Sequence, residues 1–185
     1  MQKSYTAPSI LSAGSFETDN YRDNNAEENT SFTGLLEYDK AQNNFFIEVQ
    51  DISNDLELPG ALSESEFEDD PTQVNSDFIN DFRNEDISVI RLGYARDFGD
   101  HRFSIDATRR ETEADIRQSF RNSPSPESGF DDRENNSLNP KLSGSFHAGA
   151  DIPYVVGIDL EEVDYELEIP FFFFGPGITT SSNEQ

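Results

Sequence analysis

The segment from Ile87 to Thr112 constrains the fold most, because apolar and polar residues alternate along much of it. Alternate side chains of a strand point to opposite faces of a sheet, so a period of two predicts strands with one apolar face. The sequence Phe98-Gly99-Asp100-His101 divides the segment and favours a tight turn. The segment therefore predicts an antiparallel hairpin. Its apolar positions are Ile90, Leu92, Tyr94, Phe98, Phe103, Ile105 and Ala107.

Two other segments carry strand patterns. Residues 31–51 contain two arms rich in strand-forming residues around a turn at 39–44, which predicts a second hairpin. Residues 154–169 alternate between apolar residues and carboxylates. Because the apolar residues change parity within this segment, we expect a bulge or break near Glu161-Glu162.

The remaining patterns complete the predicted fold. Residues 75–83 place apolar side chains at helical spacing and predict one short helix. Residues 63–72 and 122–136 are polar and rich in turn-forming residues, which predicts loops. We therefore expect a mainly β protein, an antiparallel sandwich or small barrel with an extended N-terminal arm and at most one short helix. An outer-membrane barrel is a weaker alternative, because too few strands are predicted and no export signal precedes them.

The expected organisation has five parts. They are an extended leader-like arm and acidic linker (1–30), β hairpins with the possible short helix (31–120), a loop or hinge (121–140), C-terminal strands of the same domain (141–177) and a tail (178–185).

The acidic composition limits the partners. The chain has 38 Asp and Glu residues against 13 Lys and Arg, a formal net charge of -25. Such a field repels nucleic acid and anionic membranes, which leaves cations, a basic protein surface or a DNA-binding protein as partners. With no Cys, no stretch near the roughly 18 apolar residues of a membrane helix and no signal peptide, the expected protein has no membrane span. It is expected to be soluble and cytoplasmic on synthesis.

Charge is also unevenly distributed along the chain. Residues 142–185 contain no Lys or Arg, and we expect the arginines of residues 83–121 to balance them through cross-strand ion pairs. An anion site on the sheet is the alternative. The carboxylates of residues 162–168 face water and these arginines in our interpretation, with weak binding of divalent cations as the alternative. The arginines are Arg83, Arg91, Arg96, Arg102, Arg109, Arg110, Arg117 and Arg121.

No motif points to catalysis. The two histidines, His101 and His147, belong to no metal-ligand spacing. The sequence has no phosphate-binding glycine loop, nucleophile elbow or dinucleotide fingerprint. Carboxylates are so frequent that no pair of them marks an acid/base dyad. We therefore expect a protein that is not an enzyme and has no cofactor or dedicated metal site.

One pattern near the start points to a partner. Tyr5, Pro8, Ile10, Gly14 and Phe16 stand at the spacing Y-x-x-P-x-[LI]-x-x-x-G-x-F. This spacing resembles the leader peptide of lasso-type ribosomal peptide (RiPP) precursors. The resemblance implies an extended arm that a leader-recognition domain of the maturation machinery binds as an added strand. The alternative is an ordinary arm that docks the same rings on the core of its own protein.

A second candidate interface is the run Phe171, Phe172, Phe173 and Phe174, because four consecutive rings cannot share one face of a strand. They belong either to the core or to a partner interface. The favoured function is a non-catalytic acidic β-rich protein whose leader-like arm is recognised by a maturation or export partner. One alternative is a structural component of a larger assembly, such as a virion or surface shell, with homo-oligomer formation. Another is an acidic nucleic-acid mimic that inhibits a DNA-binding protein.

Overall fold

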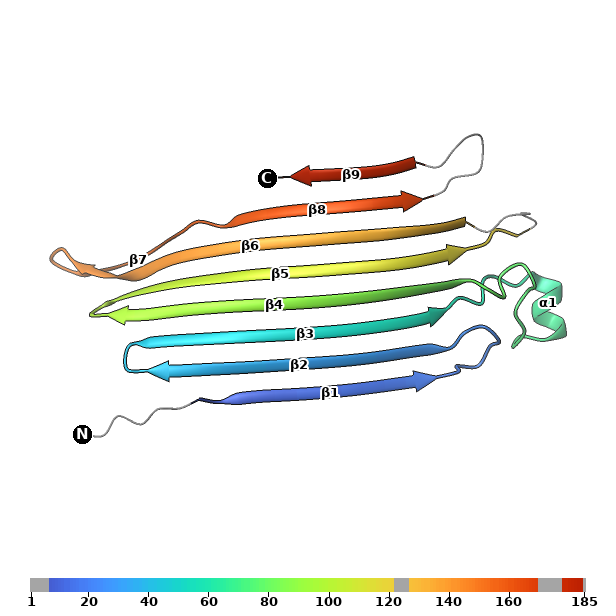
Figure 1. The fold of residues 1–185 in the computed structure, drawn as a ribbon, viewed down its shortest axis with the longest axis horizontal. Coiled ribbons are helices and arrows are strands. Elements are labelled where there is room, and N and C mark those ends of the chain that lie inside the picture. Colours follow the sequence, from blue (N-terminus) through green and yellow to red (C-terminus); the bar gives the residue numbers. More distant parts are fainter. Residues whose placement is uncertain (1–6, 122–126, 170–177, 185) are drawn as a thin grey trace.

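The computed structural model describes residues 7–121, 127–169 and 178–184, which form one sheet and one short helix (Figure 1). The strands are β1 (Ser9–Thr18), β2 (Glu27–Lys40), β3 (Asn43–Glu57), β4 (Phe82–Phe98), β5 (His101–Gln118), β6 (Glu127–His147), β7 (Asp151–Gly157), β8 (Leu160–Ile169) and β9 (Ile178–Glu184). The helix is α1 (Glu64–Asp69). The strands follow the order β1-β2-β3-β4-β5-β6-β8-β9, with β7 also paired to β6, and all pairs are antiparallel.

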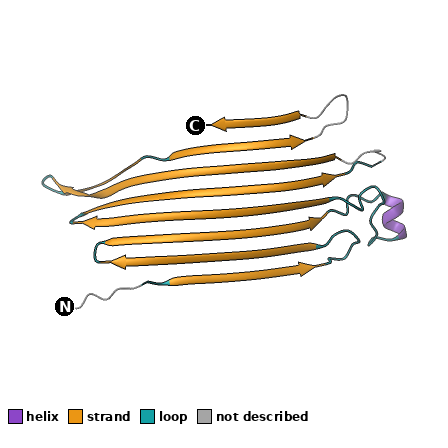
Figure 2. Ribbon diagram, viewed as in Figure 1, coloured by secondary structure: helices purple, strands orange, loops and turns teal. Residues whose placement is uncertain are grey.

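The sheet is open and forms a single layer. The prediction of a mainly antiparallel β fold with at most one short helix is confirmed (Figure 2). The described strands form one sheet that does not close, rather than the two layers of a sandwich or the ring of a small barrel. β1 and β9 are the outermost strands of this sheet.

Little of the sheet is buried. Among the described residues, the buried hydrophobic side chains are Phe78, Ala95 and Ala114. The chain exposes 12988 Å² of surface, whereas a compact monomer of its mass exposes about 9,000 Å². The excess follows from the single layer, because no described element covers either face of the sheet.

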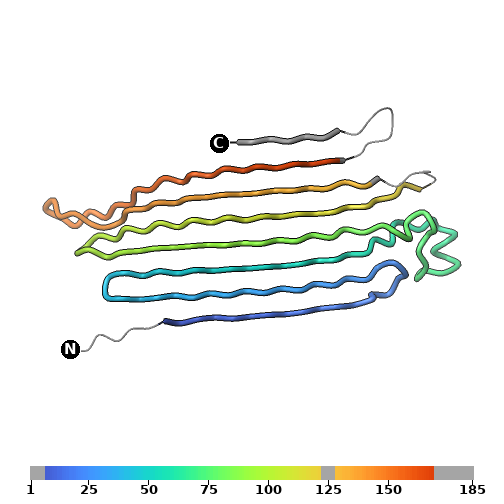
Figure 3. Tube along the Cα trace, in the orientation of Figure 1, coloured from blue at the N-terminus to red at the C-terminus, as the bar shows by residue number. Residues whose placement is uncertain are grey.

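The two ends of the sheet differ in their connections (Figure 3). At one end, residues 41–42, 99–100 and 148–150 form short turns between consecutive strands. At the other end, the connections are longer, and the connection of residues 58–81 contains α1. We call these the short-turn end and the long-connection end.

Both predicted hairpins are confirmed, as β2–β3 and β4–β5. The predicted position of the helix is wrong, because residues 76–80 form turns and α1 lies among residues that were expected to be loop. Ser63 begins the helix with a capping box. Its hydroxyl accepts the N–H of Glu66 at 3.4 Å, and the Glu66 carboxylate accepts the N–H of Ser63 at 2.7 Å.

Three segments expected as arm, loop and tail are strands. Residues 9–18 form β1, residues 127–136 belong to β6 and residues 178–184 form β9. The polar composition of residues 127–136 favours turns, but each of these residues has a pair partner on β5. Backbone pairing with a neighbouring strand therefore outweighs local preference here.

β7 and β8 lie on the same edge of β6 and continue one register. Between them, the N–H of Ile158 donates to the carbonyl oxygen of Pro140 at 3.1 Å. Proline has no N–H to return a bond, so the ladder is interrupted there. The structure has no bulge at Glu161-Glu162, because β8 pairs continuously from Leu160 onward, and the strand break of this segment falls at residues 158–159, between β7 and β8. The apolar residues instead move from one face of the sheet to the other.

Candidate functional site

One face of the sheet carries most of the exposed large hydrophobic side chains of the strands. Strand alternation and pair register place them on this common face, which we call the apolar face. Leu92, for example, pairs with Ile47 on one side and with Ala107 on the other, and its side chain is 48% exposed. The exposed members are Leu11, Phe32, Leu36, Tyr38, Phe45, Ile47, Ile90, Leu92, Phe98, Leu138, Phe146, Ile152, Val156 and Leu160.

These positions line up across neighbouring strands as a continuous apolar band. Along β4 the band extends from Ile90 to Phe98, with Arg96 on the same face before Phe98, which corresponds to about 27 Å at about 3.4 Å per residue. The rows of the band cross β4 and connect it with β2 and β3 on one side and with β5, β6 and β8 on the other. The central row consists of Leu36, Ile47, Leu92, Ala107, Leu138 and Leu160, in direct pair register from β2 to β8.

Aromatic side chains gather in the part of the band nearest the short-turn end. The rings of Phe45 and Tyr94 lie 4.6 Å apart. Farther across the sheet, the hydroxyl of Tyr154 lies 2.9 Å from Nδ1 of His101, and the Tyr154 ring lies 6.2 Å from the ring of Phe146. Rings with an apolar body and a polar tip suit a boundary between an apolar and an aqueous phase.

The opposite face, which we call the polar face, carries charged side chains at the level of the band. Arg91 lies 3.7 Å from Glu48 and 3.4 Å from Asp106, on the two neighbouring strands. Its guanidinium carbon lies 5.0 Å from the centre of the Phe46 ring. Gly93 leaves room for that ring, because a Cβ atom there would lie 1.9 Å from Cε1 of Phe46. At this level the sheet is therefore apolar on one face and polar on the other.

The apolar face becomes acidic toward the long-connection end. Glu111 pairs there with Glu134, and Glu113 pairs with Asp132. Arg109 contacts Glu111, and its guanidinium lies 3.2 Å from Glu134. Much of the negative charge on this face thus lies beyond the apolar band.

The connections at the long-connection end pack together as one unit, which we call the cap. The cap consists of residues 19–26, 58–81 and 119–121. The Arg22 guanidinium joins two parts of it, donating to the carbonyl oxygens of Gly60 at 2.9 Å and Gln73 at 3.1 Å. The N–H of Asp23 donates to the carbonyl oxygen of Thr72 at 2.8 Å.

The interior of the cap contains a buried carboxylate and a buried ring. Asp81 is 3% exposed and accepts hydrogen bonds from the N–H and the hydroxyl of Ser119, at 2.8 and 2.7 Å. The side chain of Asn24 donates to the carbonyl oxygen of Phe78 at 2.9 Å. Gly60, with φ of 61°, allows the Phe78 ring to approach, because a Cβ atom there would lie 2.3 Å from the ring.

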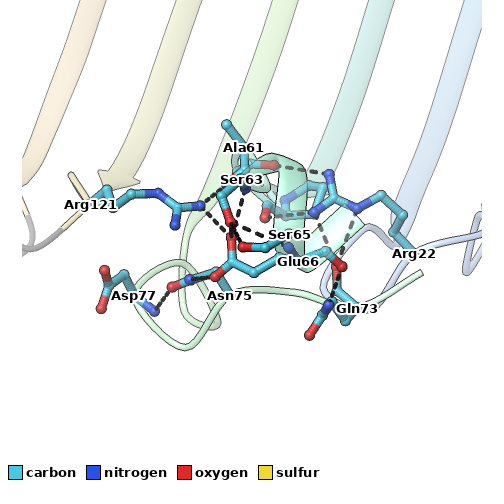
Figure 4. A network of polar contacts seen from close by, with 11 residues as sticks. Arg22, Ala61, Ser63, Ser65, Glu66, Gln73, Asn75, Asp77 and Arg121 are labelled. Carbon is cyan, nitrogen blue, oxygen red and sulfur yellow. Dashed lines mark hydrogen bonds and ion pairs between the residues drawn. The ribbon is translucent and has the colours of Figure 1, made fainter. Parts of the chain in front are cut away.

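Glu66 of α1 is the centre of a polar network that ties the helix to the third connection (Figure 4). It accepts hydrogen bonds from Arg121 at 2.8 Å, from the hydroxyl of Ser63 at 2.7 Å and from the side chain of Asn75. The Arg121 guanidinium, and then the N–H and hydroxyl of Ser63, hold the pKa of the Glu66 carboxyl far below its usual range. The ionised form of Glu66 is therefore the favoured one, and its bond to Arg121 joins α1 to the third connection.

The residues of the leader-like pattern have different surroundings. Tyr5 lies outside the described residues. Pro8 is exposed just before β1, and its carbonyl oxygen accepts the N–H of Glu37 at 3.0 Å. Ile10, Gly14 and Phe16 lie on β1, which is paired with β2, and both Ile10 and Phe16 remain exposed on the polar-face side. Recognition of this segment by a separate domain stays a prediction.

The other predicted sites also need comment. Phe171, Phe172, Phe173 and Phe174 lie outside the described residues. In the part of the chain that the structure describes, the ion pairs of the predicted arginines are with acids of β3 to β6 and α1, such as Arg91 with Glu48 and Arg121 with Glu66. The expected balance between these arginines and residues 142–185 is not found there. Charge balance along the sequence did not predict the partners of these arginines, because neighbouring strands of the sheet supply the nearest acids.

Sequence reasoning missed the cap. The Ser63-x-x-Glu66 spacing is a capping-box signal and predicts the start of α1. No local signal predicts that Arg22, Asn24 and Arg121 meet the same connection, because their partners lie more than 30 residues away in sequence.

The described residues limit some kinds of site. No group of three or more His, Cys, Asp or Glu residues among them is placed to hold a metal ion. Within the same ranges, no helix is long and apolar enough to cross a membrane.

Comparison with known proteins gives a match of fold alone. No family model and no curated protein matches the chain. The structure is similar to the crystal structure of the ferric citrate transporter FecA in the unliganded form, with a TM-score of 0.77 and 15% sequence identity. The match covers 95% of this chain and 27% of the transporter chain, so this chain spans about a quarter of that protein's length.

Proposed function

We propose that this sheet forms part of the wall of a membrane-spanning β-barrel of the transporter kind, with the apolar face toward lipid and the polar face toward the interior. The observation that carries the proposal is the apolar band. A single sheet exposes it without any covering layer, and each Leu or Ile side chain gains about 1.5–3 kcal/mol when it leaves water completely. Leaving the whole band in water would forgo an amount on the order of the 5–15 kcal/mol that stabilises a typical domain.

The dimensions of the band suit lipid. Outer-membrane barrels have an outward apolar band about 25 Å tall with aromatic girdles, and a polar interior. The band on β4 is of this size, and the rings of Phe98, His101 and Tyr154 lie at one edge of it. Crossing the hydrocarbon layer takes about 9–11 residues of a tilted strand. β5 and β6, with 18 and 21 residues, extend beyond it.

The connections agree with the same proposal. Barrels of this class have short turns at one rim and longer loops at the other, which is the difference between the short-turn end and the long-connection end. The name of FecA describes a transporter, and a polar interior wall is what passage of a polar solute requires. At 15% sequence identity, the similarity to FecA does not indicate a substrate for this chain.

The high negative charge is compatible with this proposal because the charge is segregated. Most acids of the apolar face, such as Glu113 and Asp132, lie beyond the band and toward the long-connection end, and Glu162 lies in the row of Ile90 at the edge of the band. At the level of the band, Glu48 and Asp106 lie on the polar face, where Arg91 pairs with both. The expectation of a soluble protein relied on the lack of a long apolar stretch and of a signal peptide, and a long apolar stretch is the signal of a membrane helix rather than of membrane-spanning strands.

A pair of tryptophan variants tests the proposal. The chain has no Trp, so a single introduced Trp is the only indole reporter. Leu138→Trp places it on the apolar face and Ser137→Trp places it on the polar face of the same strand. We expect acyl-chain-brominated lipid in vesicles to quench the first strongly and the second weakly, because adjacent residues of a strand point in opposite directions.

A third variant provides the depth control. Asp132→Trp lies on the same side of β6 as Leu138 but beyond the band, and we expect it to be quenched weakly. Equal quenching at positions 137 and 138, or none at 138, would contradict the proposal. A water-soluble oligomer with Leu138→Trp shielded from both lipid and aqueous quenchers would favour the assembly alternative instead.

A further inference from the structure

The cap contains an exposed hollow, lined by both apolar and polar side chains, that the proposed barrel wall does not use. The hollow measures about 340 Å³ and lies between the first connection and α1. Tyr21 forms one side, while Leu62, Phe67 and Pro71 form the other. Tyr21 is 70% exposed and Phe67 is 58% exposed. Single exposed apolar side chains are common, whereas apolar side chains gathered in one exposed place can mark a binding site.

Both sides of the hollow are held in place. Next to Tyr21, Arg22 donates to the carbonyl oxygens of Gly60 and Gln73, and its guanidinium is part of the lining (Figure 4). The neighbouring Asp23 N–H donates to the carbonyl oxygen of Thr72. These bonds connect the segment that carries Tyr21 to the segments before and after α1. The hollow is therefore preformed, which lowers the entropy cost of binding.

The position of Phe67 is set by the helix. The capping box between Ser63 and Glu66 begins α1, and the ion pair of Glu66 with Arg121 ties the helix to the connection after β5. Phe67 follows Glu66 directly and points away from this network, as its exposure indicates. The charge that orients the helix and the ring that lines the hollow thus come from adjacent residues.

The surroundings of the hollow are strongly acidic. Glu64 is part of the lining, and Glu68, Asp69 and Asp70 are exposed on or just after the helix. The last turn of α1 contains no basic residue. Arg22 also lines the hollow, but its guanidinium is bonded to the carbonyl oxygens of Gly60 and Gln73. A hollow with two rings and a mainly acidic rim selects a basic partner that also carries an apolar anchor.

We propose that this hollow is a docking site for a basic protein segment, which inserts one apolar side chain between Tyr21 and Phe67 while its Lys or Arg residues meet Glu64, Glu68 and the acids after α1. The site does not depend on the lipid contact of the apolar face. The two rings contact the apolar side chain of the partner. The carboxylates select a positively charged partner and speed its encounter with the site.

Synthetic peptides test this site on the full chain, in the same detergent or vesicle preparation for every variant. The probe is a fluorescent peptide of about twelve residues with alternating Lys and Ser and one central Leu. One comparison peptide has Ser in place of the Leu, and another has Glu in place of every Lys. At about 150 mM salt, where the Debye length is about 8 Å, we expect only the first peptide to bind measurably.

Variants locate the binding. We expect Tyr21→Ser and Phe67→Ser each to weaken the Kd of the Lys/Leu peptide about tenfold, which is a usual effect for an aromatic anchor. Glu64→Gln combined with Glu68→Gln should weaken it and flatten its salt dependence. The matched control is Ile79→Ser, which removes another exposed apolar side chain (54% exposed) of the same connection and should leave the Kd unchanged.

Several results would overturn the inference. One is equal binding by the peptides with and without Leu, which would mean attraction by net charge alone. Another is an equal loss in Ile79→Ser and Phe67→Ser. Failure of the tryptophan quenching test with intact, ring-dependent peptide binding would remove only the barrel proposal, and the reverse outcome would remove only the docking site.

Discussion

At the residue scale, Gly93 has the most direct structural consequence. It faces Phe46 across the β3–β4 pair, and the Phe46 ring occupies the space that a side chain at position 93 would need. Arg91 covers the same ring from its other side. The glycine therefore supports a stacked arrangement of ring and guanidinium on the polar face.

We predict that Gly93→Ala destabilises the protein by about 1–3 kcal/mol, because the Phe46 ring has to leave its position. Denaturant unfolding in detergent, followed by circular dichroism, measures the change. Gly34→Ala is the matched control, since its Cβ atom would meet the end of the Val49 side chain at 3.2 Å and the Phe32 ring at an ordinary contact distance of 3.6 Å. A second check adds Gly93→Ala to the Phe46→Ala variant. Because the ring is then absent, the added methyl group should destabilise this variant much less than it destabilises the unmodified protein. Equal effects of the two glycine variants would contradict this account of Gly93.

At the element scale, α1 depends on one ionised side chain. Arg121 and Ser63 lower the pKa of Glu66 in the folded cap, whereas an unfolded Glu titrates near 4.3. A group with a lowered folded-state pKa stabilises the fold above its unfolded pKa, and this contribution is lost as the pH falls toward the folded value. The cap should therefore persist through mildly acidic pH.

We predict that the Glu66 carboxyl, followed by NMR, remains ionised at about pH 4, where ordinary glutamates are largely protonated. Arg121→Gln should return its titration toward the ordinary range and should speed hydrogen exchange of the α1 amides. Glu68→Gln, on an exposed position of the same helix, is the control and should change neither quantity. Should Glu66 of the unmodified protein titrate together with Glu68, the network around Glu66 would not exist in solution.

At the scale of the whole molecule, the exposed area decides the behaviour in water. The excess of 12988 Å² over the roughly 9,000 Å² of a compact monomer is concentrated on a sheet whose apolar face lacks a covering layer among the described residues. Large exposed apolar patches drive association or bind a membrane. The net charge of -25 opposes association but does not remove the apolar face.

We predict that the chain self-associates in aqueous buffer and is monodisperse with high β content in detergent micelles. Sedimentation velocity and circular dichroism in the two media measure this. The matched variant is Leu92→Arg with Ser137→Arg as its control: the first should cost about 2–4 kcal/mol of stability in lipid and the second far less, because only lipid-facing positions carry that penalty. A monodisperse monomer in plain buffer would contradict the prediction.

Local patterns were sufficient for part of the fold. The alternation around Leu92 and Ile105 predicts β4 and β5, and the apolar arms around Phe45 predict β2 and β3, because a period of two is a property of each strand alone. Residues 127–136 gave no such signal, since their strand state depends on pairing with β5. The Ser63-x-x-Glu66 spacing indicates where α1 begins. The apolar spacing of residues 75–83 is the more conspicuous helical pattern, and it predicts the helix at the wrong place.

For the candidate sites, the sequence was less informative. The pattern from Tyr5 to Phe16 predicts a free arm, whereas Ile10 and Phe16 lie on a strand paired with β2. Nothing in the order of residues indicates that Tyr21 and Phe67 line one hollow, because the hollow requires contacts between connections that are distant in the chain. Contacts of that kind follow from strand order.

Residue order alone thus established a mainly antiparallel β protein, its hairpins and its excess of acid, since these depend on neighbours within a few residues. Tertiary structure alone decided that the apolar positions of β2 to β8 share one register and one face, that most acids on that face lie beyond the band, and that three connections meet in the cap. The physical reason is that a shift of one residue between two strands would send every side chain of a strand to the other face, and only the pairing of the strands excludes that shift.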